Sequence, residues 1–597
     1  MSFTGAELII HLLERQGVRL IAGIPGGALL PLYEALGRSH RIRHVLARHE
    51  QAAGFIAQGM ARLTGKAGVC LATSGPGVTN LITAIADAKL DSVPLVCITG
   101  QVPQHLIGTD AFQEVPTLAM AGPVTKASFF VRSAQELWRV IPEAFRIAES
   151  GRPGPVLIDV PKDVQSQVAH EEGYDRSTGQ PTAAIAMDVP RAGLEMDGRP
   201  TRSRAAGQAQ AYDRAARLIA EAQRPVLYIG GGVVKARAHH LVRELAELTS
   251  IPMTTTLMAL GTLPHDHPLN LGMLGMHGAR HTHHVLDECD LLIAIGARFD
   301  DRATGRPDRF APNAQVIHID IDTRELGKIR LPTLAIEDDA QVALQELVAR
   351  AQHQHRFQWQ ARVRRLRADY PLLTPDQETV CSPYGIVRAV GELAGADAIV
   401  TTDVGQHQMW VAQTYPFQRP DRWLTSGGLG TMGFGLPAAI GAALAKPGAN
   451  VICFTGDGSL LMNIQELATL AELDLNVKIV LLDNAALGMV RQQQELLHGR
   501  RLVASQFQGP SRFAAIAEAF GIAALDLETP HSPREVLTRT LNSAGPLLIR
   551  VPIAAHLHVL PMVAPGTANV DALDHEHGKF DSYDIDNGAT RRVGAEH

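Results

Sequence analysis

Polar residues at two predicted strand ends could bind a divalent cation and a diphosphate. Gly456-Asp457-Gly458-Ser459 follows the apolar run 451–454, and Asn484 follows a second apolar run, 477–482. An open α/β sheet places its ligands at such strand ends. A carboxylate and an amide oxygen suit Mg²⁺, which prefers oxygen ligands together with substrate phosphates. The glycines let the backbone approach a diphosphate closely, and Ser459 opens a predicted helix whose N-terminus favours the anion.

A second set of candidate residues lies near the N-terminus. Glu50 precedes the small-residue run 52–62, which predicts a helix. On its own, a glutamate at this position is typically a helix N-terminal charge stabilised by the helix dipole. However, the Gly-Pro-rich segments 23–27 and 73–80 predict two strand-to-helix turns nearby. We therefore keep Glu50 as a candidate for acid–base chemistry.

Length and composition predict a soluble globular protein with several domains. The 597 residues correspond to about three or four domains. The net charge of −6 gives no reason to expect nucleic acid or an anionic membrane as partner. The five cysteines form no Cys-x-x-Cys pair, which favours reduced thiols in a cytoplasmic protein. No secretory signal is evident at the N-terminus, and no apolar run reaches membrane-spanning length.

Apolar runs alternate with helical patterns along most of the chain. The predicted fold class is α/β, with three doubly wound, mainly parallel-sheet domains. Thr4 is predicted to cap a helix over 5–16, with Glu7 as its capping-box partner. The predicted organisation is a first domain at 1–165, a polar linker at 166–205, a central domain at 206–345, a helical connector at 346–380, a third domain at 381–565 and a polar, frayed tail at 566–597.

An ordered set of motifs over nearly all of residues 4–565 resembles the thiamine-diphosphate enzyme family. Within that family it resembles the large subunits of acetolactate (acetohydroxyacid) synthase. No single motif is specific, but the ordered set is. Its main members are Arg48-His49-Glu50-Gln51, Ala72-Thr73-Ser74-Gly75-Pro76-Gly77, Gly108-Thr109-Asp110-Ala111-Phe112-Gln113-Glu114, Gly405-Gln406-His407-Gln408-Met409-Trp410, Gly430-Thr431-Met432-Gly433-Phe434-Gly435 and Leu487-Gly488-Met489-Val490.

The resemblance implies a reaction and three cofactors: thiamine diphosphate, Mg²⁺ and FAD. The reaction is the decarboxylating condensation of pyruvate with a second 2-ketoacid to give 2-acetolactate, the first common step of branched-chain amino acid synthesis. Glu50 would share a proton with the aminopyrimidine ring, which a raised pKa in an apolar pocket would favour. Met432 would hold the two cofactor rings together, and Asp457, Asn484 and the Ala486 carbonyl would ligate Mg²⁺.

The resemblance also implies partners. In this family the activating glutamate meets the diphosphate site across two subunits, so a homodimer or tetramer is expected. A small regulatory subunit is a further candidate partner.

The candidate residues that the resemblance assigns fall into four groups. The catalytic candidates are Glu50, Gln113 and Met432. The thiamine-diphosphate and metal candidates are Pro25, Gly26, Pro76, Asn80, Val404, Gly405, Gln406, His407, Gly430, Met432, Gly456, Asp457, Gly458, Ser459, Asn484, Ala486, Gly488 and Met489. The flavin candidates are Arg152, Gly230, Gly231, Gly232, Thr256, Leu257, Met276, His277, Arg298, Asp300, Arg302 and Asp320. The substrate candidates are Gly27, Phe112, Lys162, Arg302 and Gln493.

Several alternatives stay open beside this interpretation. The chain could be another thiamine-diphosphate carboligase, or a pyruvate oxidase that uses the flavin for redox chemistry. A catalytically silent scaffold is disfavoured because every proposed catalytic position is filled. The run 428–433 also matches a dinucleotide fingerprint, and the histidines at 277–284 could suggest zinc, but both patterns are weak alone.

One position departs from the family pattern. Biosynthetic members usually carry Trp where this chain has Gln493, and that Trp is associated with preference for 2-ketobutyrate as second substrate. One methylene in an apolar pocket contributes about 1–3 kcal/mol of discrimination. We expect the amide to weaken this preference, and Arg491 together with Gln493 to make the entrance more polar.

Overall fold

Three six-stranded sheets carry the fold of the computed structural model. The structure describes residues 2–170, 174–175, 180–181, 202–509, 511–528, 532–574, 583–586 and 589–592. The chain divides into two units, of which the first comprises residues 1–199, 426–448 and 462–477, and the second comprises the rest. The three parallel-sheet α/β domains confirm the predicted fold class.

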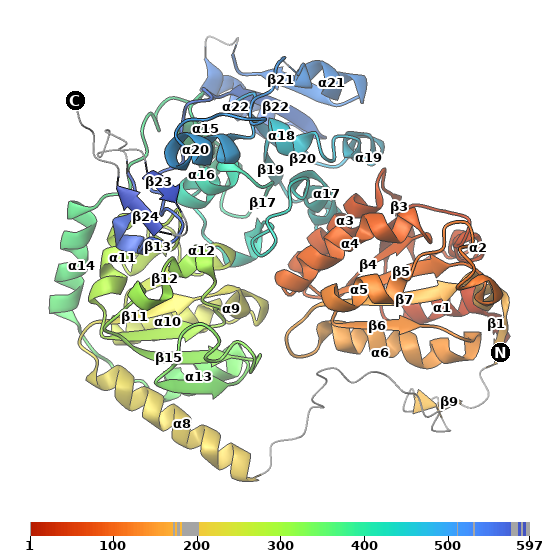
Figure 1. Ribbon diagram of the computed structural model, residues 1–597, viewed down its shortest axis with the longest axis horizontal. Coiled ribbons are helices and arrows are strands. Elements are labelled where there is room, and N and C mark those ends of the chain that lie inside the picture. Colours follow the sequence, from red (N-terminus) through yellow and green to blue (C-terminus); the bar gives the residue numbers. More distant parts are fainter. Residues whose placement is uncertain are drawn as a thin grey trace. The chain divides into compact units, whose positions relative to one another are not determined.

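The first sheet lies in the N-terminal unit and has the strand order β3-β2-β4-β5-β7-β6, with every neighbouring pair parallel. Helices cover both faces (Figure 1), so its strands are continuous apolar runs. The strands are β2 (Leu20–Gly23), β3 (Arg43–Leu46), β4 (Gly68–Ala72), β5 (Leu95–Gln101), β6 (Ala127–Phe130) and β7 (Pro155–Pro161). The helices used below are α1 (Gly5–Arg15), α3 (Glu50–Thr64), α4 (Pro76–Leu90), α6 (Leu137–Glu149) and α7 (Lys162–Ser166).

Helix α1 begins at the residue that the capping box in the sequence predicts. The Thr4 side chain accepts a hydrogen bond from the Glu7 amide, and the Glu7 carboxylate accepts one from the Thr4 amide at 2.9 Å. The predicted capping box is therefore confirmed. Two otherwise unpaired donors at the helix start are satisfied by it.

The central sheet has the strand order β13-β12-β11-β14-β15-β16, again with parallel neighbours. This is the arrangement of dinucleotide-binding domains, whose strand order reverses between the first and fourth strands. The strands are β11 (Pro225–Ile229), β12 (Met253–Thr255), β13 (Asn270–Met273), β14 (Leu291–Ile295), β15 (Gln315–Asp320) and β16 (Leu334–Glu337). Helices α8 (Arg202–Glu221), α10 (His239–Thr249), α11 (Arg280–Glu288), α13 (Ala340–Arg350) and α14 (Phe357–Asp369) surround it.

The third sheet has the strand order β18-β17-β19-β20-β22-β21. Numbered along the chain, this repeats the order of the first sheet. β17 is parallel to β18 and β19, and β22 is parallel to β20 and β21. The strands are β17 (Ile399–Thr402), β18 (Trp423–Leu424), β19 (Val451–Gly456), β20 (Val477–Asp483), β21 (Ala523–Asp526) and β22 (Leu547–Pro552).

Two helices from the C-terminal part of the sequence belong to the N-terminal unit: α17 (Gly435–Ala445) and α19 (Glu466–Glu472). α17 packs directly on α3. A Cβ at Gly59 of α3 would lie 2.3 Å from the Ala438 carbonyl oxygen, and one at Gly441 of α17 would lie 2.1 Å from the Ile56 carbonyl oxygen. The two helices approach this closely only because these residues are glycines.

The predicted linker and tail lie partly outside the described residues, namely at 171–173, 176–179, 182–201, 575–582, 587–588 and 593–597. The start of the predicted tail, 566–574, packs against the central domain, although its polarity predicts a frayed segment. The Asn569 side-chain amide donates to the Ala303 carbonyl at 2.9 Å, and Asp574 pairs with Arg280. The predicted domain boundaries stay predictions.

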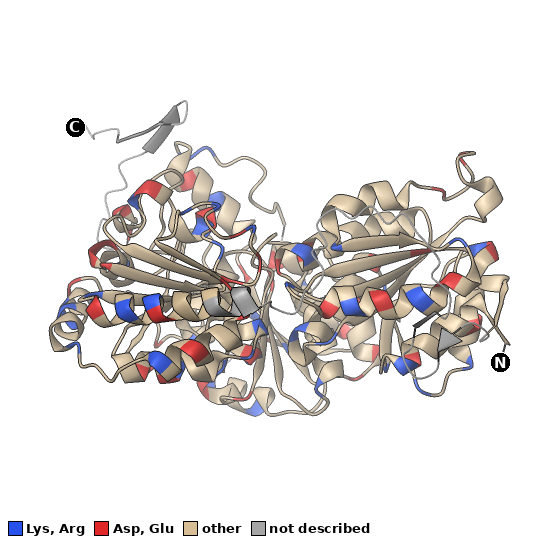
Figure 2. Cartoon of the chain, turned by 90° about the horizontal axis from the view of Figure 1, so that it is seen from below, with Lys and Arg blue, Asp and Glu red and all other residues tan. Residues whose placement is uncertain are grey.

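Basic and acidic residues intersperse along the described helices (Figure 2). Among the described helices, none is both long enough and apolar enough to cross a membrane.

Candidate active site

The carboxyl ends of β17, β19 and β20 bring the predicted cation-binding residues together. Gly405 follows β17, Asp457 follows β19, and Asn484 follows β20. β17 and β19 are neighbours across which the strand order reverses, the place where open α/β sheets bind ligands. The sequence-based placement of Asp457 and Asn484 at one sheet edge therefore matches the structure.

A single backbone amide joins the two predicted metal ligands. The Ala486 N–H donates to Asp457 Oδ2 and to Asn484 Oδ1, each at 3.1 Å. Asp457 Oδ1 accepts from the Gly458 amide at 2.9 Å. Ala485, between these residues, has a φ of 51°, a left-handed conformation that is uncommon for alanine. The tight turn therefore brings a carboxylate oxygen and an amide oxygen side by side.

The charge at this point suits a cation. Burial, with a smaller contribution from the neighbouring Asp483 carboxylate, raises the pKa of Asp457 to about 7, against two backbone hydrogen bonds that lower it. Asp483 is itself paired with Arg550 at 2.6 Å, so Asp457 is the carboxylate whose ionised form a nearby cation would stabilise. The oxygen-only donor set fits Mg²⁺.

Next to this pair lies a buried histidine. His407, in α16 (Gln406–Thr414), is buried, and its Nε2 has no hydrogen-bond partner among the described residues. Burial lowers its pKa to about 3, so the ring is neutral. Ser459 Oγ donates to the Val404 carbonyl at 2.7 Å. A Cβ at Gly456 would lie 2.9 Å from the His407 ring, so glycine allows the ring to pack this closely on the end of β19.

Gln406 connects the same cluster to two further segments. Its Oε1 accepts from Asn484 Nδ2 at 3.2 Å, and its Nε2 donates to Gln492 Oε1 at 2.9 Å. Gly488 allows this approach, because a Cβ there would lie 2.1 Å from Gln406 Oε1. Met489 follows Gly488 and packs on the apolar core of this sheet.

Three successive polar residues of the α20 helix (Gly488–Leu497), at positions 491–493, differ in burial and in their contacts. Gln492 is buried and exchanges two hydrogen bonds with the Val559 backbone. Arg491 is also buried and donates to the Ala555 carbonyl. It therefore does not add polarity to an entrance, unlike the expectation from sequence. Gln493 is half-buried.

In the N-terminal unit, Glu50 lies at the first position of α3 and bonds Asn80 of α4. Asn80 Nδ2 donates to Glu50 Oε2 at 2.9 Å. The buried Glu466 of α19 accepts from the Arg48 amide at 2.8 Å and so fixes the chain just before α3. Glu50 itself is half-buried. The side chain is thus held in place while part of it stays accessible.

Two glycine turns flank Glu50 at the strand reversal between β2 and β4. A Cβ at Gly26 would lie 2.4 Å from the Thr73 side chain, so only glycine fits there. Gly75, with a φ of 61°, packs against Gln113, whose own φ is also 61°. Thr73 Oγ1 is buried without a partner among the described residues. The candidates Pro25, Gly26, Pro76, Asn80 and Gln113 therefore gather near these turns.

The substrate candidates of the N-terminal unit are exposed or half-buried. Phe112 is 88% exposed, Gly27 is exposed, and Lys162 is half-buried at the start of α7.

Met432 lies in the same unit as Glu50. Two residues after Met432, the Phe434 ring packs on α3, with its centroid 5.3 Å from that of Phe55 and 5.0 Å from the Arg62 guanidinium. The loop of Met432 is therefore attached to α3 through Phe434.

In the central domain, glycines converge where the strand order reverses. Gly230, Gly231 and Gly232 follow β11, and Gly296 follows β14. A Cβ at Gly230 would lie 2.1 Å from the Gly296 carbonyl oxygen, so the two turns touch through their backbones. Thr255 and Thr256 Oγ1 are buried there without partners among the described residues. This cradle fits the pyrophosphate of a dinucleotide.

The other flavin candidates have mixed surroundings. His277 is buried, its Nδ1 lies 3.1 Å from the Pro561 carbonyl oxygen, and burial lowers its pKa to about 4. Asp300 caps the α12 helix (Asp301–Thr304) through the Ala303 amide. Asp320 Oδ1 accepts from the Asp322 amide at 2.9 Å, and Arg302 is exposed.

Arg152 belongs to the N-terminal unit and donates to Ser92. Leu257, Met276 and Arg298 are half-buried in the central domain.

The histidines of α11 bind backbone oxygens. His281 lies within 3.3 Å of the Tyr370 and Leu271 carbonyl oxygens, and His283 lies 3.1 Å from that of Gly275. Across the part of the chain that the structure describes, no cluster of three or more His, Cys, Asp or Glu side chains is arranged to hold a metal.

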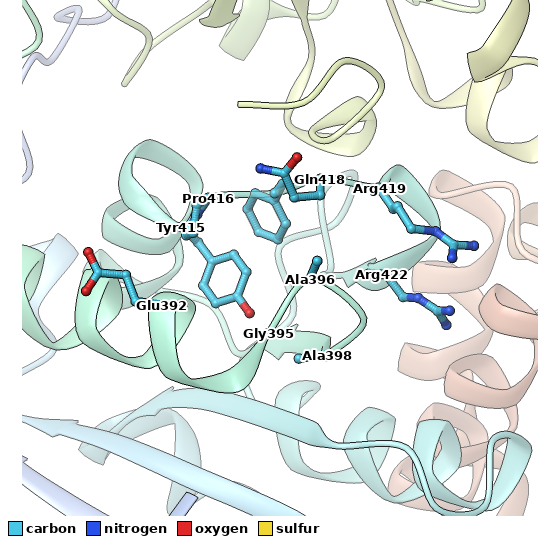
Figure 3. Close-up of a pocket in the computed structure, with 11 residues that line it drawn as sticks. Glu392, Gly395, Ala396, Ala398, Tyr415, Pro416, Gln418, Arg419 and Arg422 are labelled. Carbon is cyan, nitrogen blue, oxygen red and sulfur yellow. The ribbon is translucent and has the colours of Figure 1, made fainter. Parts of the chain in front are cut away.

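A separate hollow of about 180 Å³ lies between α15 (Pro383–Ala394) and residues 415–422 (Figure 3). The Tyr415 hydroxyl in its wall has no partner among the described residues. Arg419 pairs with Asp421, and Arg422 lies 3.7 Å from Asp397. None of the candidate active-site residues lines this hollow.

Sequence reasoning did not identify Asp483 and Gln492 as members of the cluster around Asp457. Asp483 could have been found because it ends the same strand that Asn484 follows. Gln492 gives no such signal, because its contacts depend on a distant backbone segment.

Comparisons with known proteins match these features along the whole chain. Residues 3–120 match the thiamine pyrophosphate enzyme N-terminal TPP binding domain, residues 212–347 the central domain, and residues 403–551 the C-terminal TPP binding domain. The chain is 54% identical to the acetolactate synthase isozyme 1 large subunit of Escherichia coli, over 95% of this chain and 97% of that protein. It is 46% identical to an acetolactate synthase of Mycobacterium bovis, over 95% and 90%, and 45% identical to the Escherichia coli isozyme 2 large subunit, over 96% and 99%.

Proposed function

The chain belongs to the acetolactate synthase large subunits of the thiamine pyrophosphate enzyme family, and from this premise we propose how its residues act. The activity is the decarboxylating condensation of pyruvate with a second 2-ketoacid to give 2-acetolactate, a thiamine-dependent transfer. In branched-chain amino acid synthesis this is the first common step. The observation that carries the residue assignment is the convergence of Asp457 and Asn484 on one backbone amide at the sheet edge.

Asp457, Asn484 and the Ala486 carbonyl hold Mg²⁺ in this proposal. The buried Asp457 carboxylate, the Asn484 amide oxygen and a backbone carbonyl match the oxygen ligands that this ion prefers. The cofactor diphosphate would lie against Gly456, Gly458 and Ser459, with the unpartnered His407 Nε2 as a hydrogen-bonding group. The other residues proposed to contact the diphosphate at this sheet edge are Val404, Gly405, Gln406, Gly488 and Met489.

Thiamine diphosphate, when bound, would supply the nucleophilic carbon and the electron sink for decarboxylation. Glu50 would share a proton with the pyrimidine side of the cofactor, and Asn80 fixes the orientation of its carboxylate. Gly26 and Pro76 would border the cofactor at the two turns. Gly430 and Met432 would hold it from the loop 426–432.

The reacting 2-ketoacids are small anions. Lys162 and Arg302 provide cations that attract them, and Gly27, Phe112 and Gln113 line the approach. Gln493, in place of the usual Trp, contacts the second ketoacid. Since this position is half-buried, a change there alters the acceptor pocket rather than the protein core.

The central domain holds FAD in this proposal. Its strand order, the glycine contact between Gly230 and Gly296, and the unpartnered hydroxyls of Thr255 and Thr256 support a dinucleotide there. The condensation transfers no electrons, so the flavin has a structural role.

We propose a homodimer or tetramer with shared active sites. The assignment of Glu50 to the N-terminal unit and of Asp457 and Asn484 to the second unit supports this, because the two halves of the proposed site come from different parts of the chain. The relatives named large subunits suggest a small regulatory subunit as partner. The free cysteines of the described chain are consistent with a cytoplasmic location.

The test is acetolactate formation from pyruvate by the purified protein, with and without thiamine diphosphate and after removal of divalent cations by a chelator. We expect activity only with both, and restoration by Mg²⁺. Oxygen uptake without acetolactate would instead identify a pyruvate oxidase. Absence of both reactions in the fully supplemented protein would overturn the proposal.

A further inference from the structure

Two buried carboxylates lie at the C-terminal end of α4, where the helix itself disfavours them. Asp87 is in the last turn of α4, and Asp91 is its C-terminal cap. Their exposed fractions are 0% and 5%. Like charges four residues apart repel, and the negative end of the helix dipole repels both. Something else in the structure must therefore compensate for their burial.

Part of the compensation comes from Arg62, in the last turn of α3. Its Nη2 donates to Asp91 Oδ2 at 2.8 Å and lies 3.5 Å from Asp87 Oδ2. One arginine does not neutralise two carboxylates. Burial and the charge of Asp91 raise the pKa of Asp87 to about 6, whereas Arg62 and two hydroxyl groups lower it.

Further hydrogen bonds to both carboxylates come from the loop 426–431. Asp91 Oδ1 accepts from the Gly428 amide at 2.7 Å, and its Oδ2 accepts from the Gly427 amide at 3.1 Å. Asp87 Oδ1 accepts from the Ser426 hydroxyl and, at 3.0 Å, from the Thr431 hydroxyl. Both carboxylates thus hold the same loop.

This loop has no helix or strand to fix it. It contains Gly427, Gly428 and Gly430, the last with a φ of 70°, and Leu429 at its tip is 43% exposed. One internal hydrogen bond joins the Thr431 amide to Ser426 Oγ at 2.9 Å. A glycine-rich segment of this kind samples many conformations unless its backbone amides are bound.

We propose that Asp87, Asp91 and Arg62 form a clamp that positions the loop 426–432, and through it Gly430 and Met432, for the thiamine ring. This inference rests on the proposed function of those two residues. The clamp residues are positioning residues, since they act through the loop.

The clamp also explains a feature of helices α3 and α4 (Figure 1). Each helix carries a cofactor candidate near its N-terminus, Glu50 or Asn80, and a clamp residue at its C-terminal end. The two helices pack against each other. One rigid helix pair thus presents the activating carboxylate at one end and fixes the loop of Met432 at the other.

The first test uses the protein without cofactor. Asp91→Asn removes one carboxylate oxygen from a site that binds two amides and a guanidinium. We expect amide hydrogen exchange of residues 426–432 to accelerate about tenfold, the effect of weakening hydrogen bonds to a charged group. Exchange in β4 should stay unchanged. The matched control is Asp290→Asn, which weakens a similar carboxylate cap on the Gln223 and Arg224 amides of the central domain.

The second test adds thiamine diphosphate and Mg²⁺. Asp91→Asn should weaken cofactor binding about tenfold and slow exchange of the thiazolium C2 proton for deuterium, while Asp290→Asn changes neither. Unchanged amide hydrogen exchange of residues 426–432 in Asp91→Asn would overturn the clamp. Faster amide exchange together with wild-type cofactor affinity and wild-type C2 proton exchange would overturn it as well.

If Asp91→Asn does not fold, Thr431→Val is the substitute, because it removes a single hydroxyl group from Asp87. Thr431→Val must accelerate amide exchange of the loop and weaken cofactor binding, each less than expected for Asp91→Asn. If it changes neither, the clamp is overturned. The amide hydrogen exchange of residues 426–432 is measured without cofactor or substrate. If the wild-type protein makes no acetolactate, the proposed function is wrong, but the first test still shows whether Asp91 holds the loop.

Discussion

Gln493 is the residue at which this chain departs most clearly from the family pattern. It is half-buried on α20, and the neighbouring Gln492 and Arg491 point into backbone contacts. Gln493→Trp can therefore be made without disturbing those contacts. We expect the substitution to raise selectivity for 2-ketobutyrate over pyruvate about tenfold, since contacts with one methylene contribute about 1–3 kcal/mol.

Competition between the two ketoacids at equal concentration measures this selectivity. Gln493→Leu, which removes the amide without adding an indole, is the matched control. An equal product ratio for wild type and Gln493→Trp would exclude position 493 from the acceptor pocket.

Among single residues, those placed by strand ends could be predicted from sequence, and those placed by tertiary contacts could not. Asp457 and Asn484 follow apolar runs directly, so their place at a sheet edge follows from the pattern. Gln492 binds the Val559 backbone, and Asp91 binds the Gly428 amide. These partners are far away in sequence, and no local pattern indicates them.

The pair α3 and α17 is the element on which the geometry of the N-terminal unit depends most. At Gly441 a methyl group would lie 2.1 Å from the Ile56 carbonyl oxygen, which belongs to the backbone and cannot rotate away. We expect Gly441→Ala to push the helices apart and to lower the free energy of unfolding by about 1–3 kcal/mol. Because α17 follows the loop of Met432, affinity for thiamine diphosphate should fall as well.

Denaturant unfolding and cofactor titration test this expectation. The matched control is Gly207→Ala in α8, where an added methyl group has nothing within 4 Å. Alanine favours helix over glycine by about 1 kcal/mol, so this control should be neutral or stabilising. Equal stability of both variants would show that α3 and α17 do not pack this closely.

At the level of elements, local signals predicted where helices and strands begin better than how they pair. The capping box at Thr4 and Glu7 fixed the start of α1. Continuous apolar strands predicted parallel sheets with both faces covered. Strand order depends on long-range pairing, so neither the repeated order of the first and third sheets nor the different order of the central sheet was predictable from the chain.

At the level of the whole molecule, contacts do not simply follow the order of the sequence. The domain predicted at 381–565 stays a prediction: its sheet runs from β17 to β22, while 426–448 and 462–477 group by their contacts with the N-terminal unit. The cause is the packing of α17 on α3 and the contact of Glu466 with the Arg48 amide. Such contacts leave no trace in composition or periodicity, because α17 is simply an apolar, small-residue helix.

The proposed sharing of active sites between two chains leads to a complementation experiment. Glu50→Gln alone should lower activity about 10²–10⁴-fold, the usual effect of losing a positioned acid–base group. Asp457→Asn alone should abolish Mg²⁺-dependent cofactor binding. A hybrid dimer of the two variants contains one site with both residues intact and one with neither. Random pairing of equal amounts in a twofold-symmetric dimer should therefore restore about a quarter of wild-type activity.

Coexpression of the two variants with different affinity tags yields the hybrid for acetolactate measurements. The control pairs Glu50→Gln with a chain carrying both substitutions, a combination in which no site is intact. Activity should then stay at the level of the single variants. If the first pair also stays at that level, Glu50 and Asp457 of one chain act on the same cofactor.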